Sequence, residues 1–99
     1  MFVRRVSLST QLGFCFAELG HGRLIVLDGT RSSNGAAQIR VTLGMGRVAS
    51  GALTEVGIEQ VEQQWSVDPS ALAATLGSLV HPTLALALLQ SVRGWGWLP

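Results

Sequence analysis

The sequence predicts an α+β fold, in which a small antiparallel β-rich unit precedes a C-terminal helical hairpin. As far as Trp65, apolar residues come in short alternating runs separated by glycines, which is typical of strands and turns. After Asp68 the chain is rich in alanine and leucine and is interrupted once by proline, which is typical of two short helices. We expect strands near residues 3–9, 23–28, 38–43, 47–56 and 60–65, helices over 69–80 and 82–92, a β-rich domain over 1–67 and an apolar helical tail over 68–99.

The first two segments differ in how clearly they predict their structure. In residues 3–9, Val6 and Leu8 alternate with serine and arginine, the period of a half-buried strand. The next segment, LGFCFAELGHG, has apolar residues at Leu12, Phe16 and Leu19, which is helical spacing. A short helical turn and a bent strand are both consistent with it. Gly20 and Gly22 end it in either case.

A β-hairpin is predicted next. RLIVLDG (23–29) is a compact β-branched and leucine run ending at Asp28-Gly29, a turn dipeptide. A polar loop follows, with Asn34-Gly35 as a favoured tight-turn centre. QIRVTLG (38–44) then turns its Ile, Val and Leu inward and its Gln, Arg and Thr outward, so that it pairs antiparallel with residues 23–28.

The following stretch is rich in glycine. Gly44 and Gly46 predict a turn, and residues 47–57 continue as a strand pair or as one bent strand. Residues 58–65 fit a helix through Ile58, Val61 and Trp65, and fit a strand through Val61, Gln63 and Trp65. We favour the strand.

Asp68-Pro69 marks a helix start, because a carboxylate can cap free N–H groups and proline is tolerated at the first helical position. His81-Pro82 interrupts the helical run, and the second helix ends near Gly94. Residues 71–92 have the length to span a bilayer, but their Thr, Ser, Gln, His and Pro residues dilute the apolar signal. A hairpin packed on the domain or on a partner is therefore favoured, with Trp95 and Trp97 covering the end of a small core.

Composition narrows the class of protein. A chain of 99 residues makes one small domain, and its seven basic residues, all arginine, nearly balance six acidic ones, giving a net charge of +1. No nucleic-acid partner is expected from so weak a field. Charged residues make up 13%, against about 25% in soluble domains, so some apolar surface is expected to meet a protein partner. The single Cys15 fits a reducing compartment and a small buried hydrophobe.

No residue cluster predicts catalysis, a metal or a cofactor. Gly44, Gly46 and Ala49 follow a strand in the spacing of a dinucleotide-binding turn, but nearby glycines weaken the helix that must come next. Turns between strands explain them better. His21 and His81 lack partners at metal-ligand spacing, and Asp28 and Asp68 have structural roles in a turn and a helix cap. We expect no enzyme.

Several of these segments also follow a family pattern. Ala17-Glu18-Leu19, then Gly22 and the strand Leu24 to Asp28, are followed by Ile39 to Leu43, the glycines Gly44 and Gly46, and the segment Gly51 to Gly57. In this order, residues 16–65 resemble the SpoA (surface presentation of antigens) domain of flagellar motor switch proteins and type III secretion cytoplasmic ring proteins.

The resemblance implies a β-rich unit that exchanges strands with a second copy or a sister domain to close a shared barrel. It implies a non-enzymatic assembly subunit of a bacterial secretion or motor ring, a homodimer or a sister-subunit complex, that is cytoplasmic and at most peripheral to the inner membrane. We expect the partner contacts on the apolar sides of the strands, at Leu24, Val26, Ile39, Val41, Leu43, Val48, Leu53 and Val56.

Three alternatives remain open at this stage. Residues 71–97 would anchor a small membrane-associated protein. Gly44, Gly46 and Ala49 would serve a nucleotide-binding fragment. The abundance of glycine, alanine and arginine, with no lysine and no tyrosine, also fits the product of a fortuitous reading frame in GC-rich DNA, without a defined activity.

Overall fold

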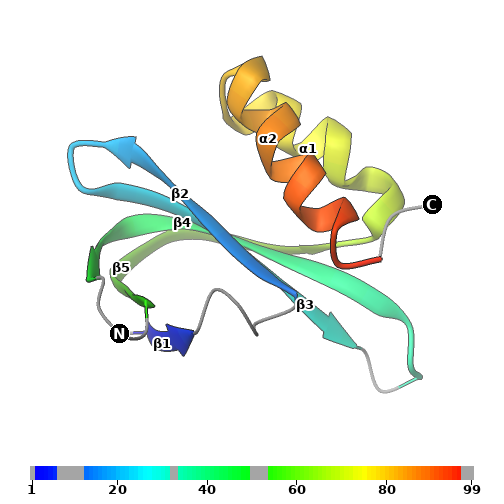
Figure 1. The fold of residues 1–99 in the computed structure, drawn as a ribbon, viewed down its shortest axis with the longest axis horizontal. Coiled ribbons are helices and arrows are strands. Elements are labelled where there is room, and N and C mark those ends of the chain that lie inside the picture. The colour runs from blue at the N-terminus through cyan, green and yellow to red at the C-terminus, as the bar shows by residue number, and fades with distance from the viewer. Residues whose placement is uncertain (1, 7–12, 32–33, 50–53, 97–99) are drawn as a thin grey trace.

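The chain folds into an antiparallel sheet with a helical hairpin on one face (Figure 1). The structure is a computed structural model that describes residues 2–6, 13–31, 34–49 and 54–96. Its five strands are arranged in the order β1-β5-β4-β3-β2, which confirms the predicted α+β class. The elements are β1 (Phe2–Val6), β2 (Phe14–Gly20), β3 (Arg23–Arg31), β4 (Ala37–Ala49), β5 (Thr54–Val67), the 3-10 turn η1 (Pro69–Ala71), α1 (Leu72–Leu79) and α2 (Pro82–Arg93).

Strands β3 and β4 form the predicted hairpin, but it is longer than the sequence indicated. Their register runs from Arg23 opposite Met45 to Arg31 opposite Ala37. Asp28-Gly29 therefore does not end the strand, because both residues keep partners on β4. The turn lies further on, where Gly35 has a φ of +86° and the Asn34 side chain accepts a hydrogen bond from the Ala36 amide (3.1 Å).

Strand β2 resolves the ambiguity between a helical turn and a strand. It pairs antiparallel with β3 from Phe14 opposite Asp28 to Gly20 opposite Arg23. The predicted break at the two glycines is the β2–β3 turn, where Gly20, His21 and Gly22 have φ values of 92°, 55° and 78°. Glycine adopts this left-handed region without a Cβ clash.

Gly44 and Gly46 make a bend within β4, and the predicted turn at this position is wrong. Strand β4 continues through both glycines, and its register with β5 shifts between Leu43 and Gly44 and again between Met45 and Gly46. A Cβ on Gly44 would overlap the carbonyl oxygen of Gln60, and one on Gly46 would overlap that of Gly57. The absence of a side chain thus allows β5 to cross the bend at close range.

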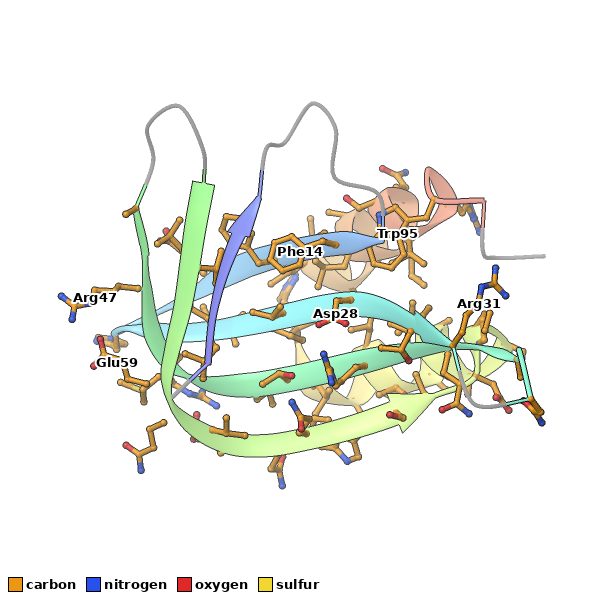
Figure 2. All side chains as sticks on the ribbon, turned by 90° about the horizontal axis from the view of Figure 1, so that it is seen from below. Phe14, Asp28, Arg31, Arg47, Glu59 and Trp95 are labelled. Carbon is orange, nitrogen blue, oxygen red and sulfur yellow. The ribbon has the colours of Figure 1, made fainter. Side chains whose placement is uncertain are left out.

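The bend divides each long strand into two parts. Seen from below, β4 and β5 turn a corner, so that β1 and the first part of β5 cross over β2 and β3 (Figure 2). Strand β1 pairs with this part of β5, from Phe2 opposite Ile58 to Val6 opposite Thr54. The predicted strands 47–56 and 60–65 are therefore parts of β4 and β5, while residues 7–9 and 50–53 lie outside the described residues.

The helical hairpin begins and breaks where the sequence predicted. Asp68 is the N-cap of η1, but its side chain makes no capping hydrogen bond, and its carbonyl oxygen accepts from the Ala71 amide (2.9 Å). The predicted carboxylate cap is thus wrong, and proline at the first position begins the turn. At the second break, the Nδ1 atom of His81 accepts from the Thr83 amide (3.1 Å) and starts α2.

Two hydrophobic clusters lie on opposite faces of the sheet. The helix-side cluster joins β3 and β4 to both helices, and its buried residues are Ile25, Leu27, Ile39, Val41, Leu43, Leu72, Leu76, Ala85, Leu88 and Val92. The bend-side cluster lies beneath the corner, and its buried residues are Phe14, Leu24, Val26, Val56 and Ile58. The boundary at 67/68 is the junction between sheet and helices, and the two parts share one core.

Candidate interaction surface

Most residues predicted to contact a partner lie inside the chain's own core. Ile39, Val41 and Leu43 belong to the helix-side cluster, where they are covered by α1 and α2. The helical hairpin, which was expected to pack on the domain or on a partner, therefore packs on the domain and covers these strand residues. Each such side chain contributes about 1.5–3 kcal/mol when it is removed from water, and the single chain already gains that energy.

The remaining predicted contacts belong to the other face. Leu24, Val26 and Val56 are buried in the bend-side cluster, and Val48 packs against it partly exposed. Leu53 lies outside the described residues. The bend places the first part of β5 over β3, so this face is also covered from within the chain. Of the residues predicted as partner contacts, those that the structure describes form the core of the single chain, and Val48 borders it.

The nucleotide-binding pattern does not have the geometry that it requires. A dinucleotide site needs a strand, a glycine turn and then a helix whose N-terminus meets the phosphates. Gly44, Gly46 and Ala49 all lie within the continuous strand β4. The two glycines lie where β5 crosses β4 at close range.

The histidine, cysteine and carboxylate side chains are dispersed in the structure. Within the described part of the chain, no group of three or more His, Cys, Asp or Glu side chains could hold a metal ion. His21 lies in the β2–β3 turn and His81 caps α2, as expected of loop residues. Burial raises the pKa of the Cys15 thiol from 9.0 to about 12, so at neutral pH it is a protonated, weakly reactive group.

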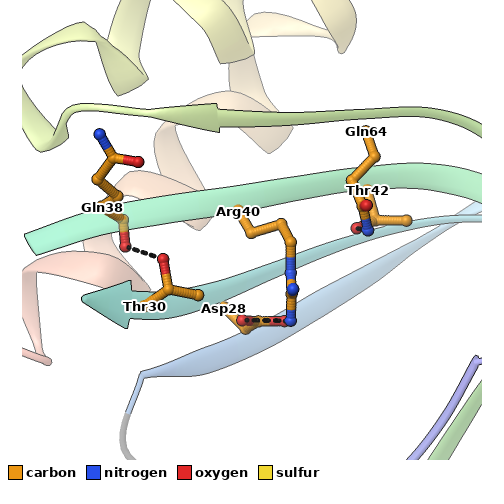
Figure 3. Close-up of polar contacts among 6 residues, drawn as sticks. All are labelled: Asp28, Thr30, Gln38, Arg40, Thr42 and Gln64. Carbon is orange, nitrogen blue, oxygen red and sulfur yellow. Dashed lines mark hydrogen bonds and ion pairs between the residues drawn. The ribbon is translucent and has the colours of Figure 1, made fainter. Parts of the chain in front are cut away.

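A row of polar contacts crosses the sheet face opposite the helices, beyond the bend-side cluster (Figure 3). Nη2 of Arg40 donates to both carboxylate oxygens of Asp28, at 3.3 Å each. Gln64 donates to the Thr42 hydroxyl (3.0 Å). Asp28 is only 3% exposed, so its arginine compensates a buried negative charge. Such a pair positions β3 on β4.

The open edge of the sheet at β2 is the feature that the sequence pattern did not reveal. In the described part of the chain, β2 has β3 on one side and no strand on the other. The Gly29 amide donates to the Gly13 carbonyl (2.7 Å). By antiparallel alternation the backbone groups of Cys15 and Ala17 face β3, while those of Phe16 and Glu18 point away from the sheet.

The side chains of β2 leave this edge largely apolar. Cys15, Ala17 and Leu19 pack partly buried against the helix-side cluster, and α2 lies against this strand. On the other face, Phe16 is partly buried and its ring lies 6.2 Å from that of Phe14. Glu18 is the one charged residue of the strand.

Strand β5 provides a contrast at the other side of the sheet. Strand β1 covers it only from Thr54 to Ile58, and among the described residues the rest of that edge has no strand beside it. It carries two glutamates, paired with arginines: Arg47 Nε donates to Glu59 (2.8 Å) and Arg23 Nε to Glu62 (3.2 Å). Charged side chains commonly protect sheet edges from pairing with other strands. Strand β2, with Glu18 alone, has fewer such charges than β5.

A signal for β2 was present in the sequence. Phe14, Phe16 and Glu18 alternate with Cys15, Ala17 and Leu19, which is the two-residue period of a strand. Helical spacing obscured it because both faces of β2 contact apolar residues. Whether a strand lies at an edge depends on the order of all strands, which no local pattern contains.

Comparison with known proteins finds no matching family model, no matching curated protein and no matching solved structure. None of the helices in the described residues is long and apolar enough to cross a membrane. The interpretation of this surface therefore rests on its geometry.

Proposed function

We propose that this chain is a non-enzymatic assembly subunit that joins another copy or a sister subunit by strand pairing and apolar burial. The observation that carries the proposal is the open, weakly charged edge of β2. Its Phe16 and Glu18 backbone groups point away from the sheet and are positioned to bond to an incoming strand. An incoming strand would satisfy those groups and cover the exposed part of Phe16.

The physical basis is the reactivity of sheet edges. A row of outward N–H and C=O groups is a template for another strand, and proteins that remain monomeric usually protect it with charge, proline or a covering segment. Strand β2 has no proline and a single charge. Pairing along such an edge is a known mode of recognition, in which backbone hydrogen bonds give affinity and alternate side chains give specificity.

The setting we propose is a cytoplasmic ring of a type III secretion system or a flagellar motor. This setting rests on the resemblance of residues 16–65 to the SpoA domain and on the single thiol, which fits a reducing compartment. Secretion or flagellar genes next to the gene for this chain would support it. An unrelated neighbourhood, with the chain fractionating outside the cytoplasm, would contradict it.

Photo-crosslinking in the source cell tests the assembly function. A benzophenone amino acid at Glu18, which is exposed on β2, is expected to form a covalent adduct with the partner strand. The same residue at Ala74, exposed on α1, is the matched control and should give none. Mass spectrometry of the adduct tells another copy from a sister subunit. Equal background at both positions would overturn the proposed function.

A further inference from the structure

Strand β2 has a pattern that is complementary to itself. A two-fold contact places the same strand on both sides, so each side chain must tolerate its counterpart. The only charge on β2 is Glu18. A pairing of the two strands that is centred on Ala17, one residue earlier, keeps the two copies of Glu18 from facing each other. The chain's net charge of +1 adds little long-range repulsion between copies.

We propose that two copies of this chain pair β2 to β2 about a two-fold axis at Ala17, which joins their sheets into one. This inference rests on the proposed function and names the partner. With Ala17 opposite Ala17, Phe16 of each copy lies opposite Glu18 of the other. Those are the residues whose backbone groups point outward, so each pair can exchange its N–H and C=O bonds.

The choice of Ala17 as the centre follows from steric and charge arguments. The two central residues form a non-hydrogen-bonded pair, in which Cα atoms approach to about 4.5 Å. Alanine is the smallest residue between the two ends of β2, and its side chain lies on the face that α2 covers. A centre at Glu18 would place two carboxylates opposite each other, which is destabilising.

A second copy is favoured over pairing of β2 with the open edge of β5. That contact would be heterologous, leaving a free β2 and a free β5 edge at its ends, and would therefore grow into open-ended chains. The two-fold contact occupies both β2 edges at once and closes.

The first test measures the mass of the purified full chain by light scattering. We expect twice the chain mass of 10.5 kDa at hundreds of micromolar. Glu18→Pro should give a monomer, because proline removes an outward N–H that β3 does not use. Glu18→Gln is the matched control and should remain dimeric. A wild-type monomer, or a series of larger species, would overturn the proposal.

The second test fixes the register and does not depend on the proline variant folding. In a Cys15→Ala background, Ala17→Cys should form an intermolecular disulfide under mild oxidation, since only this centre brings the two residues 17 face to face. Val61→Cys, on the exposed edge of β5, should not. A wild-type dimer without the Ala17→Cys crosslink would overturn the register.

These results also separate the two proposals. A purified monomer together with a Glu18 photo-adduct to a different protein would overturn self-pairing and leave the assembly function standing. A purified monomer with no adduct in the cell would overturn both.

Discussion

Folding changes the ionisation of Cys15. It lies on β2 under the helical hairpin, and burial raises the pKa of its thiol from 9.0 to about 12. The sequence contains neither lysine nor tyrosine, the other side chains whose usual pKa values lie in that interval. Between pH 9 and pH 12, Cys15 is therefore the one side chain expected to titrate differently in the folded and unfolded states.

We predict that the chain loses stability as the pH rises from 9 to 12. Below pH 9 the thiol is protonated in both states. Above it, the unfolded chain releases this proton while the folded chain retains it, so unfolding becomes more favourable by up to about 1.4 kcal/mol per pH unit. Denaturant unfolding of the wild type should show this slope, and Cys15→Ala should lack it. If the free energy of unfolding of the wild type and of Cys15→Ala fell equally with pH, the attribution of the slope to Cys15 would be contradicted.

Asp28 and Arg40 show where prediction from single residues fails. Asp28 followed by glycine is a common turn signal, and Arg40 was expected to point outward into solvent. In the structure they face each other across the hairpin, and Asp28 is buried. The local pattern identified both strands, but the pairing that buries this carboxylate depends on a partner twelve positions along the chain.

At the scale of elements, the helical hairpin was predictable because its signals are local. Proline at residues 69 and 82 determines where the helical segments begin, whatever they pack against. The bend at Gly44 and Gly46 could not be predicted in this way, because glycines between apolar residues are equally consistent with a turn and with a bent strand. What decides between them is the approach of β5, which is a contact between distant segments.

We predict that Gly46→Ala destabilises the fold while Gly77→Ala does not. An added methyl at Gly46 meets the Gly57 carbonyl of β5, and such overpacking costs about 1–3 kcal/mol. Gly77 lies in α1, where an added methyl would meet nothing within 4 Å, so alanine there should gain about 0.5–1 kcal/mol. Thermal or denaturant unfolding measures both. Equal effects would show that the bend has room for a side chain.

At the scale of the whole molecule, the helical hairpin completes the sheet's core. The sequence predicted a β-rich domain followed by an apolar helical tail, because composition changes at Asp68, and it favoured packing of that tail on the domain or on a partner. It left open which of the two the helices cover, so the predicted interface fell on residues that the helices bury. The open edge of β2 emerged only from the strand order.

We predict that Leu88→Ala and Leu86→Ala, two positions apart on α2, differ sharply in stability. Leu88 is 4% exposed within the helix-side cluster, and Leu86 is 57% exposed. Leu88→Ala should lower the free energy of unfolding by about 2–5 kcal/mol, and Leu86→Ala by less than about 0.5 kcal/mol. Near-UV circular dichroism during unfolding follows the loss of packing around Trp65 and Trp95. A tail that does not pack on the sheet would make both substitutions neutral.

The pairing of β1 with β5 has a consequence for synthesis. Strand β1 is made before the other strands of the sheet, but its Phe2 pairs with Ile58, so β1 stays unpaired until most of the sheet has been made. The other strands pair with their sequence neighbours and can form as each emerges. Closing so long a loop is slow, and we expect β1 amides to be the last of the sheet protected in pulsed hydrogen exchange during refolding. Protection of β1 before β3 would contradict this order.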